Sequence, residues 1–335
     1  MTISGLFLFH VNSHQYTNMT TQHFYAFNYG YNNYNDYTPN EVNLGDYIQS
    51  LAAMGFYPHI DGYTDRDNCL QEPRHEKVKI IANGWYSLDD NHHTFHPKYD
   101  PLFVAFHINN INQPHQHPKA LSYLKEKSLI HPIGCRDYST LSYLQKYNIN
   151  SYFSSCLTTT LDRTRFTKTD QRSGVVFCDL PALVAPKLFP LNRFLTQWKK
   201  YNKLNKLIKQ EISSLPQSKI TTTTHSASLT TTHEERFSLA KDLLAKYSSA
   251  ELVITSRIHC ALPCLALGTP VILIAPYDDL RYKGIGELLN HVYLDGQSIT
   301  EVKINRDHAG KIKNPDNYKV FAEQLKSTCL KFVTE

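Results

Sequence analysis

The seven cysteines of this 335-residue chain form no CxxC pair, their number is odd and their spacing is irregular. Disulfide frameworks and zinc sites both draw on paired or regularly spaced cysteines. The pattern therefore argues against a disulfide-stabilised or zinc-holding protein. It favours reduced thiols, as in a cytoplasmic protein.

Long apolar segments are also lacking, since no window approaches 18 consecutive apolar residues. The first residues, Met1–His14, contain a short apolar run, Leu6–Phe9, without a preceding basic region or a small-residue cleavage site. We expect neither a signal peptide nor an integral membrane segment.

An excess of one charge is missing as well. The chain has 35 Lys and Arg against 30 Asp and Glu, a net charge of +5 with its 17 His neutral. A nucleic-acid-binding protein needs a concentrated basic surface, so we expect no nucleic-acid partner. A small anionic substrate remains compatible with this charge.

Three common catalytic motifs are absent: GxGxxG, the P-loop and the nucleophile elbow. Their absence argues against the commonest dinucleotide-binding, kinase and hydrolase classes.

Hydrophobic residues make up 41% of the chain, with 22 Tyr, 16 Phe and 2 Trp. This is enough for two packed cores, and the length favours two domains. Short apolar strands alternate with amphipathic helices, and this alternation is typical of parallel sheets with crossover helices.

In the first half the expected strands are Phe24–Tyr29, Val78–Ala82, Phe103–Ile108, a short strand from Ile133, and Ser151–Phe153. The expected helices run from Asn43 to about Met54, over Pro118–Lys127 and over Tyr138–Tyr147. A loop rich in Tyr and Asn, Gly30–Pro39, precedes the first helix.

In the second half the expected strands are Ser173–Phe177, Lys219–Thr223, Glu251–Thr255 and Pro270–Ile274. The expected helices are Lys199–Ile212, Glu234–Tyr247, Ile258–Leu267 and Asn317–Phe332, with Thr224–Thr232 as a loop. We predict an α/β protein with two Rossmann-like lobes, residues 1–165 and 166–335, and a ligand cleft between them. The last helix could pack back on the first lobe.

Two strand ends carry candidate site residues. Thr255-Ser256-Arg257-Ile258-His259 joins a buried strand to an apolar helix, where free N–H groups attract anions and His259 can carry a proton. A helix cap with an incidental Arg and His is the structural alternative. In the first lobe Arg136 ends a strand and could grip a carboxylate or phosphate, while Asp137 could simply cap the next helix.

Six histidines crowd the first lobe: His92, His93, His96, His107, His115 and His117. They lack the HExxH spacing and a matching set of carboxylates, so we expect no metal site. His107 differs from the others because it ends a predicted strand and could face the cleft. Asp46, near a helix start, and the hydroxyl cluster around Thr158 are weaker signals, more often caps and turns.

Together these residues resemble the polysaccharide pyruvyl transferase family over roughly residues 40 to 290. The resemblance rests on the order and spacing of several motifs: Asn43-x-Gly45-Asp46, Asn83-Gly84-Trp85, Phe106-His107-Ile108, Pro132–Asp137, Ser155–Leu161, Thr224-His225, Glu235-Arg236-Phe237, Thr255–Cys260, Pro263–Val271, Arg281 and Gly284.

The resemblance implies a fold like that of the glycosyltransferase B class, with phosphoenolpyruvate as donor co-substrate and a saccharide or glycan as acceptor, in the synthesis of cell-surface polysaccharides. We expect no other cofactor and no metal, because the charge of the arginines suffices for such a donor. We expect His259 and Asp46 as catalytic residues. The expected substrate-binding residues are Arg257, Arg136, His225, His107, Asn83, Thr158 and Arg281. A homo-oligomer is left open.

Two alternatives stay open at this point. A glycosyltransferase of the same two-lobed fold would use Arg and His against the diphosphate of a sugar nucleotide. A catalytically inactive glycan-binding protein would use the aromatic residues instead. Release of phosphate, release of a nucleotide, or binding without turnover would separate the three.

Overall fold

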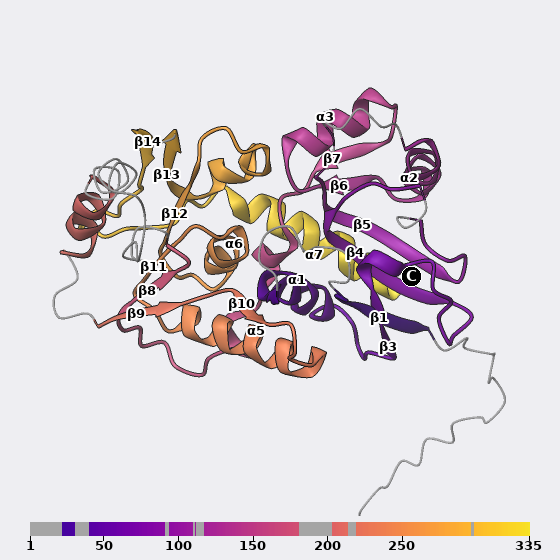
Figure 1. Cartoon of the computed structure of the whole chain (residues 1–335), viewed down its shortest axis with the longest axis horizontal. Helices are drawn as coiled ribbons and strands as arrows, with labels where there is room; N and C mark the ends of the chain where they lie inside the picture. Colours follow the sequence, from indigo (N-terminus) through magenta and orange to yellow (C-terminus); the bar gives the residue numbers. More distant parts are fainter. Residues whose placement is uncertain are drawn as a thin grey trace, which may run out of the picture.

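The computed structural model describes residues 22–30, 40–90, 94–109, 111, 117–180, 203–213, 219–295 and 298–335. Two six-stranded sheets dominate it, and they lie side by side with helices between them (Figure 1). The predicted α/β architecture with two Rossmann-like sheets is therefore confirmed.

The first sheet has the order β3-β1-β4-β5-β6-β7, and all its strand pairs are parallel. Its strands are β1 (His23–Asn28), β3 (Gly62–Asp65), β4 (Val78–Tyr86), β5 (Tyr99–Ile108), β6 (Ile133–Cys135) and β7 (Ser151–Phe153). The helices of this part are α1 (Leu44–Met54), α2 (Pro118–Ile130) and α3 (Tyr138–Lys146).

The second sheet has the order β14-β13-β12-β11-β8-β9 and is parallel except for β14. Its strands are β8 (Val175–Cys178), β9 (Ile220–Thr223), β11 (Leu252–Thr255), β12 (Val271–Pro276), β13 (Asn290–Asp295) and β14 (Ser298–Lys303). Its helices are residues 203–212, α5 (His233–Ser248), α6 (Ile258–Ala266) and α7 (Tyr318–Thr334).

In each sheet the order in which successive strands are added reverses beside the first strand. The reversal lies between β1 and β4 in the first sheet and between β8 and β11 in the second. Ligands of open α/β sheets bind beyond the carboxyl ends of the strands at such points. Asp179 and Ser256 follow the two strand ends at this point of the second sheet, so a ligand bound there would lie close to them.

A third, two-stranded sheet joins the two halves of the chain. In it β10 (Ser226–Ser228) pairs antiparallel with β2 (Glu41–Asn43). The prediction of Thr224–Thr232 as a loop was wrong in this part. The sequence there is low in complexity, and β10 is a strand because β2, more than 180 residues earlier in the chain, supplies its partner.

Several helices begin at or near the residues predicted from the sequence, and a side-chain cap is present at each of these starts. Asn43 accepts a hydrogen bond from the backbone N–H of Gly45, and Asp137 accepts one from that of Thr140. Thr232 and Glu235 form a capping box at α5. These contacts satisfy N–H groups that have no partner inside the helix.

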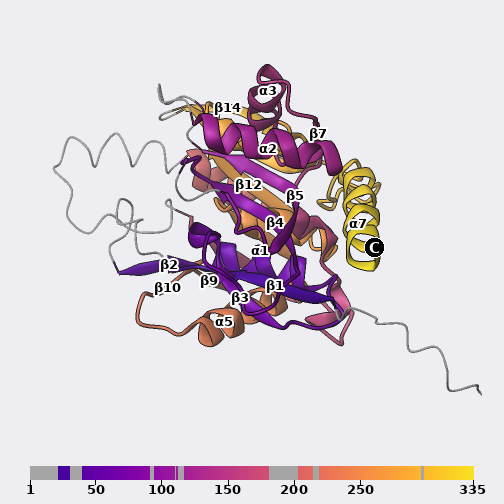
Figure 2. The ribbon, with the colours of Figure 1, turned by 90° about the vertical axis from the view of Figure 1, so that its right-hand side faces the viewer.

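The helices α1, α6 and α7 lie between the two large sheets in Figure 1, and the view of Figure 2 shows α7 along one side of the molecule. One apolar cluster includes Leu51 of α1, Leu262 of α6 and Phe332 of α7 together with residues of both sheets. From the first sheet, the buried Lys79 donates through Nζ to the carbonyl oxygen of Phe332, at 2.7 Å. The last helix thus contacts the first sheet.

Some sequence predictions lie outside the described residues, namely most of the Gly30–Pro39 loop and the first four residues of the Lys199–Ile212 helix. No helix in the part of the chain that the structure describes is long and apolar enough to cross a membrane.

Candidate active site

Arg136 and His259, predicted from opposite halves of the chain, touch each other. The guanidinium Nη1 of Arg136, which follows β6, lies 3.3 Å from Nε2 of His259 in the first turn of α6. Arginine can only donate a hydrogen bond, so His259 Nε2 is the acceptor and carries no proton here. The two residues form the centre of the site.

The start of α1 packs directly on His259. A Cβ placed on Gly45 would stand 3.1 Å from both Cβ and Nδ1 of His259, a separation tighter than ordinary van der Waals contact. Glycine therefore lets α1 approach the histidine. This gives the Asn43-x-Gly45-Asp46 motif a physical reason that spacing alone did not supply.

The environment of His259 disfavours its charged form. Burial lowers its pKa well below the ordinary value, and the positive charge of Arg136 acts in the same direction, with smaller contributions from His225, Arg281 and His107. An anion bound among these groups would offset the repulsion and raise the pKa again. The histidine can thus gain a proton when a negatively charged ligand arrives.

Arg136 is the largest of the fully buried side chains, at 1% exposure. Its Nε has no hydrogen-bond partner, and no carboxylate among the described residues forms an ion pair with it. Burial lowers its pKa, although its guanidinium stays charged. A buried cation without a counter-ion is costly, and it is typical of a site that awaits an anion.

Arg257, the residue before α6, is half exposed and forms an ion pair with Asp179. Its Nε donates to Asp179 Oδ2 at 2.7 Å, and neither terminal nitrogen has a partner among the described residues. Asp179 also accepts from the backbone N–H of His225 and has a φ of 49°. Sequence reasoning missed Asp179, although a carboxylate directly after a predicted strand was a usable signal.

Asp46 is buried in α1, where Gln49 Nε2 donates to its Oδ1 at 3.1 Å and Arg66 Nη1 lies 3.9 Å away. Its negative charge also supports the charged form of Arg136. The structure therefore places Asp46 near the site, engaged with neighbouring side chains.

Asn83 and Thr158 are fully buried beside this centre. Asn83 donates to the backbone oxygen of Gln49 at 3.1 Å, and its Oδ1 has no partner. Thr158 belongs to η2 (Leu157–Thr160), which packs on α6, and its hydroxyl lies 3.2 Å from Cys156 Sγ. The amide of Asn83 and the hydroxyl of Thr158 are therefore both inaccessible from the protein surface.

His107 and Arg281 line a cavity of about 200 Å³ between the two halves of the chain, together with Ile108, Asn109, Ile111, Asp279 and Leu280. His107 is 2% exposed, and its Nδ1 lies 2.6 Å from Asp137 Oδ2. Arg281 forms an ion pair with Asp279 at 2.5 Å. The structure thus brings His107 and Arg281 together, and Asp137 both caps α3 and binds a histidine.

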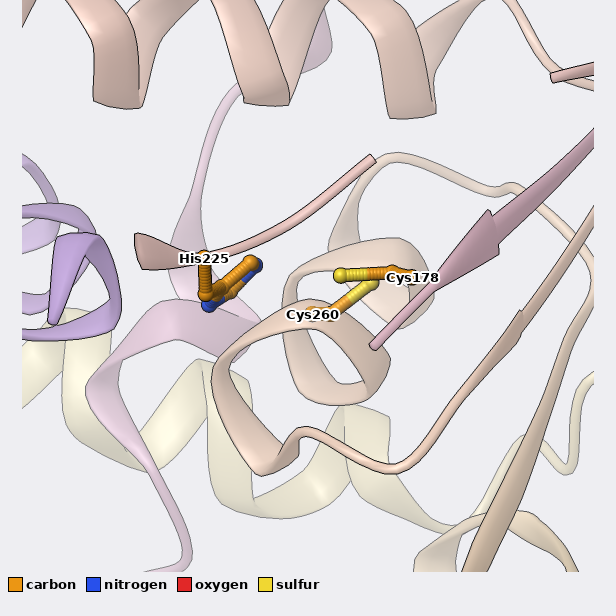
Figure 3. A group of neighbouring side chains, drawn as sticks. All are labelled: Cys178, His225 and Cys260. Atoms are coloured by element: carbon orange, nitrogen blue, oxygen red, sulfur yellow. The ribbon is translucent and has the colours of Figure 1, made fainter. Parts of the chain in front are cut away.

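His225 lies in the interior, at 1% exposure, with Cys178 and Cys260 (Figure 3). The candidate ligand atoms of the three residues all lie within 4.8 Å of one another, from three segments that are far apart in the sequence. The spacing of the cysteines in the sequence did not predict this cluster. His92, His93 and His115 of the predicted histidine group lie outside the described residues.

Hydrogen bonds within the protein already occupy this cluster. His225 Nε2 lies 2.8 Å from the hydroxyl of Tyr247, which also contacts Cys178 Sγ. The contact with Cys260, and burial, raise the pKa of Cys178, and burial raises that of Cys260, so both thiols hold their protons. Metal ligation needs thiolates, and the cluster offers three ligand atoms where structural zinc sites use four.

We therefore expect a chelator to leave the protein unchanged. Overnight dialysis against EDTA should alter neither the melting temperature nor the enzymatic activity, because we expect neither the fold nor the chemistry to require an ion in this cluster. Differential scanning fluorimetry before and after dialysis is the measurement. A lower melting temperature that zinc restores in the wild type but not in Cys178→Ser would place a structural ion here.

The lowered pKa of His259 predicts how stability depends on pH. Between the folded pKa and the ordinary value of about 6.5, the unfolded chain binds a proton that the folded protein excludes. The free energy of unfolding should therefore fall as the pH drops below about 6.5, by at most about 1.4 kcal/mol per pH unit for one proton.

Urea denaturation at pH 5.5 to 7.5 measures this dependence. His107 and His233 also have lowered pKa values and contribute in the same direction. His259→Gln should therefore reduce the slope without removing it, and an unchanged slope would mean that His259 is not repelled from its charged form. The exposed His308 provides the control, because His308→Gln reports the effect of a histidine-to-glutamine change at a solvent-exposed position.

A buried arginine, a neutral histidine and a second arginine meet at the α6 end of the second sheet, and such a set of groups is suited to a small anionic ligand. The comparison with known families is consistent with that. The family model for polysaccharide pyruvyl transferase matches residues 19–279, most of the chain. The protein belongs to this family, and the resemblance drawn from its motifs is confirmed.

Among solved structures, an uncharacterized protein from Klebsiella pneumoniae is 13% identical, with a TM-score of 0.39, and the match covers 78% of this chain and 87% of that one. A family 9 glycosyl transferase from Veillonella parvula is 11% identical, with a TM-score of 0.28, covering 92% and 97%. These overall similarities are low, and nothing about the site rests on them. None of the curated proteins compared is significantly similar in sequence.

Proposed function

We propose that this protein transfers the pyruvyl group of phosphoenolpyruvate to hydroxyl groups of a saccharide. The observation that carries the proposal is the buried Arg136, which forms no close ion pair with a carboxylate among the described residues and contacts the neutral His259. Membership of the polysaccharide pyruvyl transferase family supports a polysaccharide-modifying transferase. The choice of phosphoenolpyruvate as donor is our inference.

Phosphoenolpyruvate carries a phosphate and a carboxylate on one small carbon frame, so it needs two cationic groups. Arg136 supplies a buried guanidinium, and Arg257, at the start of α6, supplies two terminal nitrogens that have no partner among the described residues. Arginine binds either anion through two parallel hydrogen bonds. The N–H groups at the start of α6 would add to the attraction.

The proposed reaction begins with a proton. The bound anion raises the pKa of His259, which then donates its proton to the methylene carbon of the donor, and the central carbon becomes an oxocarbenium-like centre. A saccharide hydroxyl attacks this carbon and loses its proton to a base. The bond to the phosphate oxygen then breaks, and phosphate departs with the electron pair. A second hydroxyl of the saccharide then attacks the same carbon and closes a cyclic ketal. The proton of this hydroxyl passes to the released phosphate, which leaves as hydrogen phosphate.

Asp46 fits this scheme as a positioning residue. Its carboxylate is already engaged by Gln49 and Arg66, and its charge favours the charged state of Arg136. We therefore assign it to holding the cationic site and not to proton transfer. His225, inside the core and electrostatically coupled to His259, is assigned a similar supporting part.

The test is the release of phosphate from phosphoenolpyruvate in the presence of methyl β-galactoside or N-acetylglucosamine. Phosphoenolpyruvate at millimolar concentration should also raise the melting temperature, because a ligand of the folded state stabilises by mass action. A melting shift with UDP-glucose and none with phosphoenolpyruvate would identify a nucleotide-sugar enzyme instead. A shift with a saccharide alone, without phosphate release, would indicate a glycan-binding protein.

A further inference from the structure

His107 and Asp137 form a pair that the chemistry proposed for Arg136 and His259 does not use. Asp137 is completely buried, and its Oδ2 lies 2.6 Å from His107 Nδ1. A carboxylate can only accept, so His107 Nδ1 carries the proton and donates it. Its other nitrogen, Nε2, then has a free lone pair.

That second nitrogen is buried and has no hydrogen-bond partner. A buried polar atom without a partner costs free energy and requires an explanation. His107 is also one of the residues that line the cavity of about 200 Å³ between the two halves of the chain. Ligand sites for drug-sized molecules are usually larger, about 300 Å³ or more, so this cavity suits a single terminal sugar ring.

The remaining groups around this cavity match a polar, uncharged ligand. Arg281 and Asp279 neutralise each other in an ion pair, and Asn109 offers an amide. Arg136 acts electrostatically on His107 and touches His259, so the cavity adjoins the proposed donor site. A neutral sugar bound here would lie next to the donor.

We propose that His107 is the base that accepts the proton of the attacking saccharide hydroxyl, that Asp137 positions it, and that this cavity binds the acceptor sugar. The inference rests on the proposed function and adds the acceptor half of the reaction. The hydroxyl proton passes to His107 Nε2 as the new C–O bond forms at the central carbon of the donor. His107 returns that proton to solvent or to the departing phosphate, so it ends the cycle neutral.

Two variants test the pair with little disturbance of the fold. His107→Gln removes the base and keeps a polar side chain of similar length. Asp137→Asn keeps an oxygen to cap α3, because asparagine is as good an N-cap as aspartate. Its amide group, however, donates to Nδ1 and forces the proton onto Nε2, where it blocks proton acceptance.

We expect acceptor-dependent phosphate release to fall about 100-fold or more in both variants, with methyl β-galactoside or N-acetylglucosamine as acceptor. The melting shift produced by phosphoenolpyruvate should be retained. In the wild type the rate of phosphate release should fall at acidic pH as His107 becomes protonated, and both variants should lose this dependence. The charged groups that face His107 are Asp137, Arg136, Arg281 and Asp279. Thr232→Ala, which removes the cap of α5 away from the site, should lower the melting temperature yet keep turnover.

Long-range ¹H–¹⁵N spectra show which ring nitrogen of a histidine carries the proton, and they need no acceptor. The signal of His107 is the one that is missing in His107→Gln. The wild type should carry its proton on Nδ1, and Asp137→Asn should carry it on Nε2. Turnover near the wild-type level in both variants, or a wild-type proton on Nε2, would overturn the dyad. No phosphate release from the wild type with any saccharide would instead contradict the proposed function, while the spectra would still decide the tautomer.

Discussion

Replacing Arg136 by methionine should stabilise the protein and abolish donor binding. The guanidinium is 1% exposed, its Nε lacks a partner, and it forms no ion pair with a carboxylate among the described residues. Exchange of buried charged groups for apolar ones of similar volume often stabilises a protein, by about 1–4 kcal/mol. The free energy of unfolding of Arg136→Met, measured in urea, should rise within that range.

Donor binding should fall at least about 100-fold in the same variant, since each hydrogen bond to a charged group contributes about 1.5–3 kcal/mol. Isothermal titration with phosphoenolpyruvate measures the loss. Arg165→Met, at an exposed arginine, is the matched control and should change neither quantity by much. If Arg136→Met is destabilised and still binds the donor, the arginine is a structural element of the core and the donor site lies elsewhere.

His259 and Arg257 should fail in different ways. His259→Gln removes the proton carrier, so turnover should fall by about two to four orders of magnitude while the donor still binds. Arg257→Lys keeps a charge and loses the planar group that grips an anion at two points, so the donor's KM should rise with a smaller change in kcat.

Steady-state phosphate release and donor titration on the purified variants separate the two effects. The matched control is His308→Gln, on an exposed histidine, which should behave as the wild type. A collapsed melting temperature in His259→Gln with near-normal turnover in the folded fraction would make the junction of β11 and α6 structural. The contact of His259 with Gly45 makes this comparison necessary, because the histidine also packs on α1.

Local sequence patterns were enough to predict most of the secondary structure and the family. The alternation of apolar strands and amphipathic helices predicted most strands of both large sheets, since each of these strands is specified by residues close together in the chain. It missed the strands β3, β13 and β14. Asp137 was recognised as a helix cap for the same reason. The motifs at strand ends identified Arg136, Arg257 and His259, because parallel strands place their carboxyl ends at one edge of a sheet.

Which of these groups meet depends on how the elements pack in three dimensions. The contact between Arg136 and His259 joins residues 123 positions apart, and the pair of His107 with Asp137 joins residues 30 apart. The strand β10 exists because β2 pairs with it, and Cys178 and Cys260 reach His225 through the packing of β8 and α6. Such contacts depend on how sheets and helices pack, and local residue preferences carry no information about that packing.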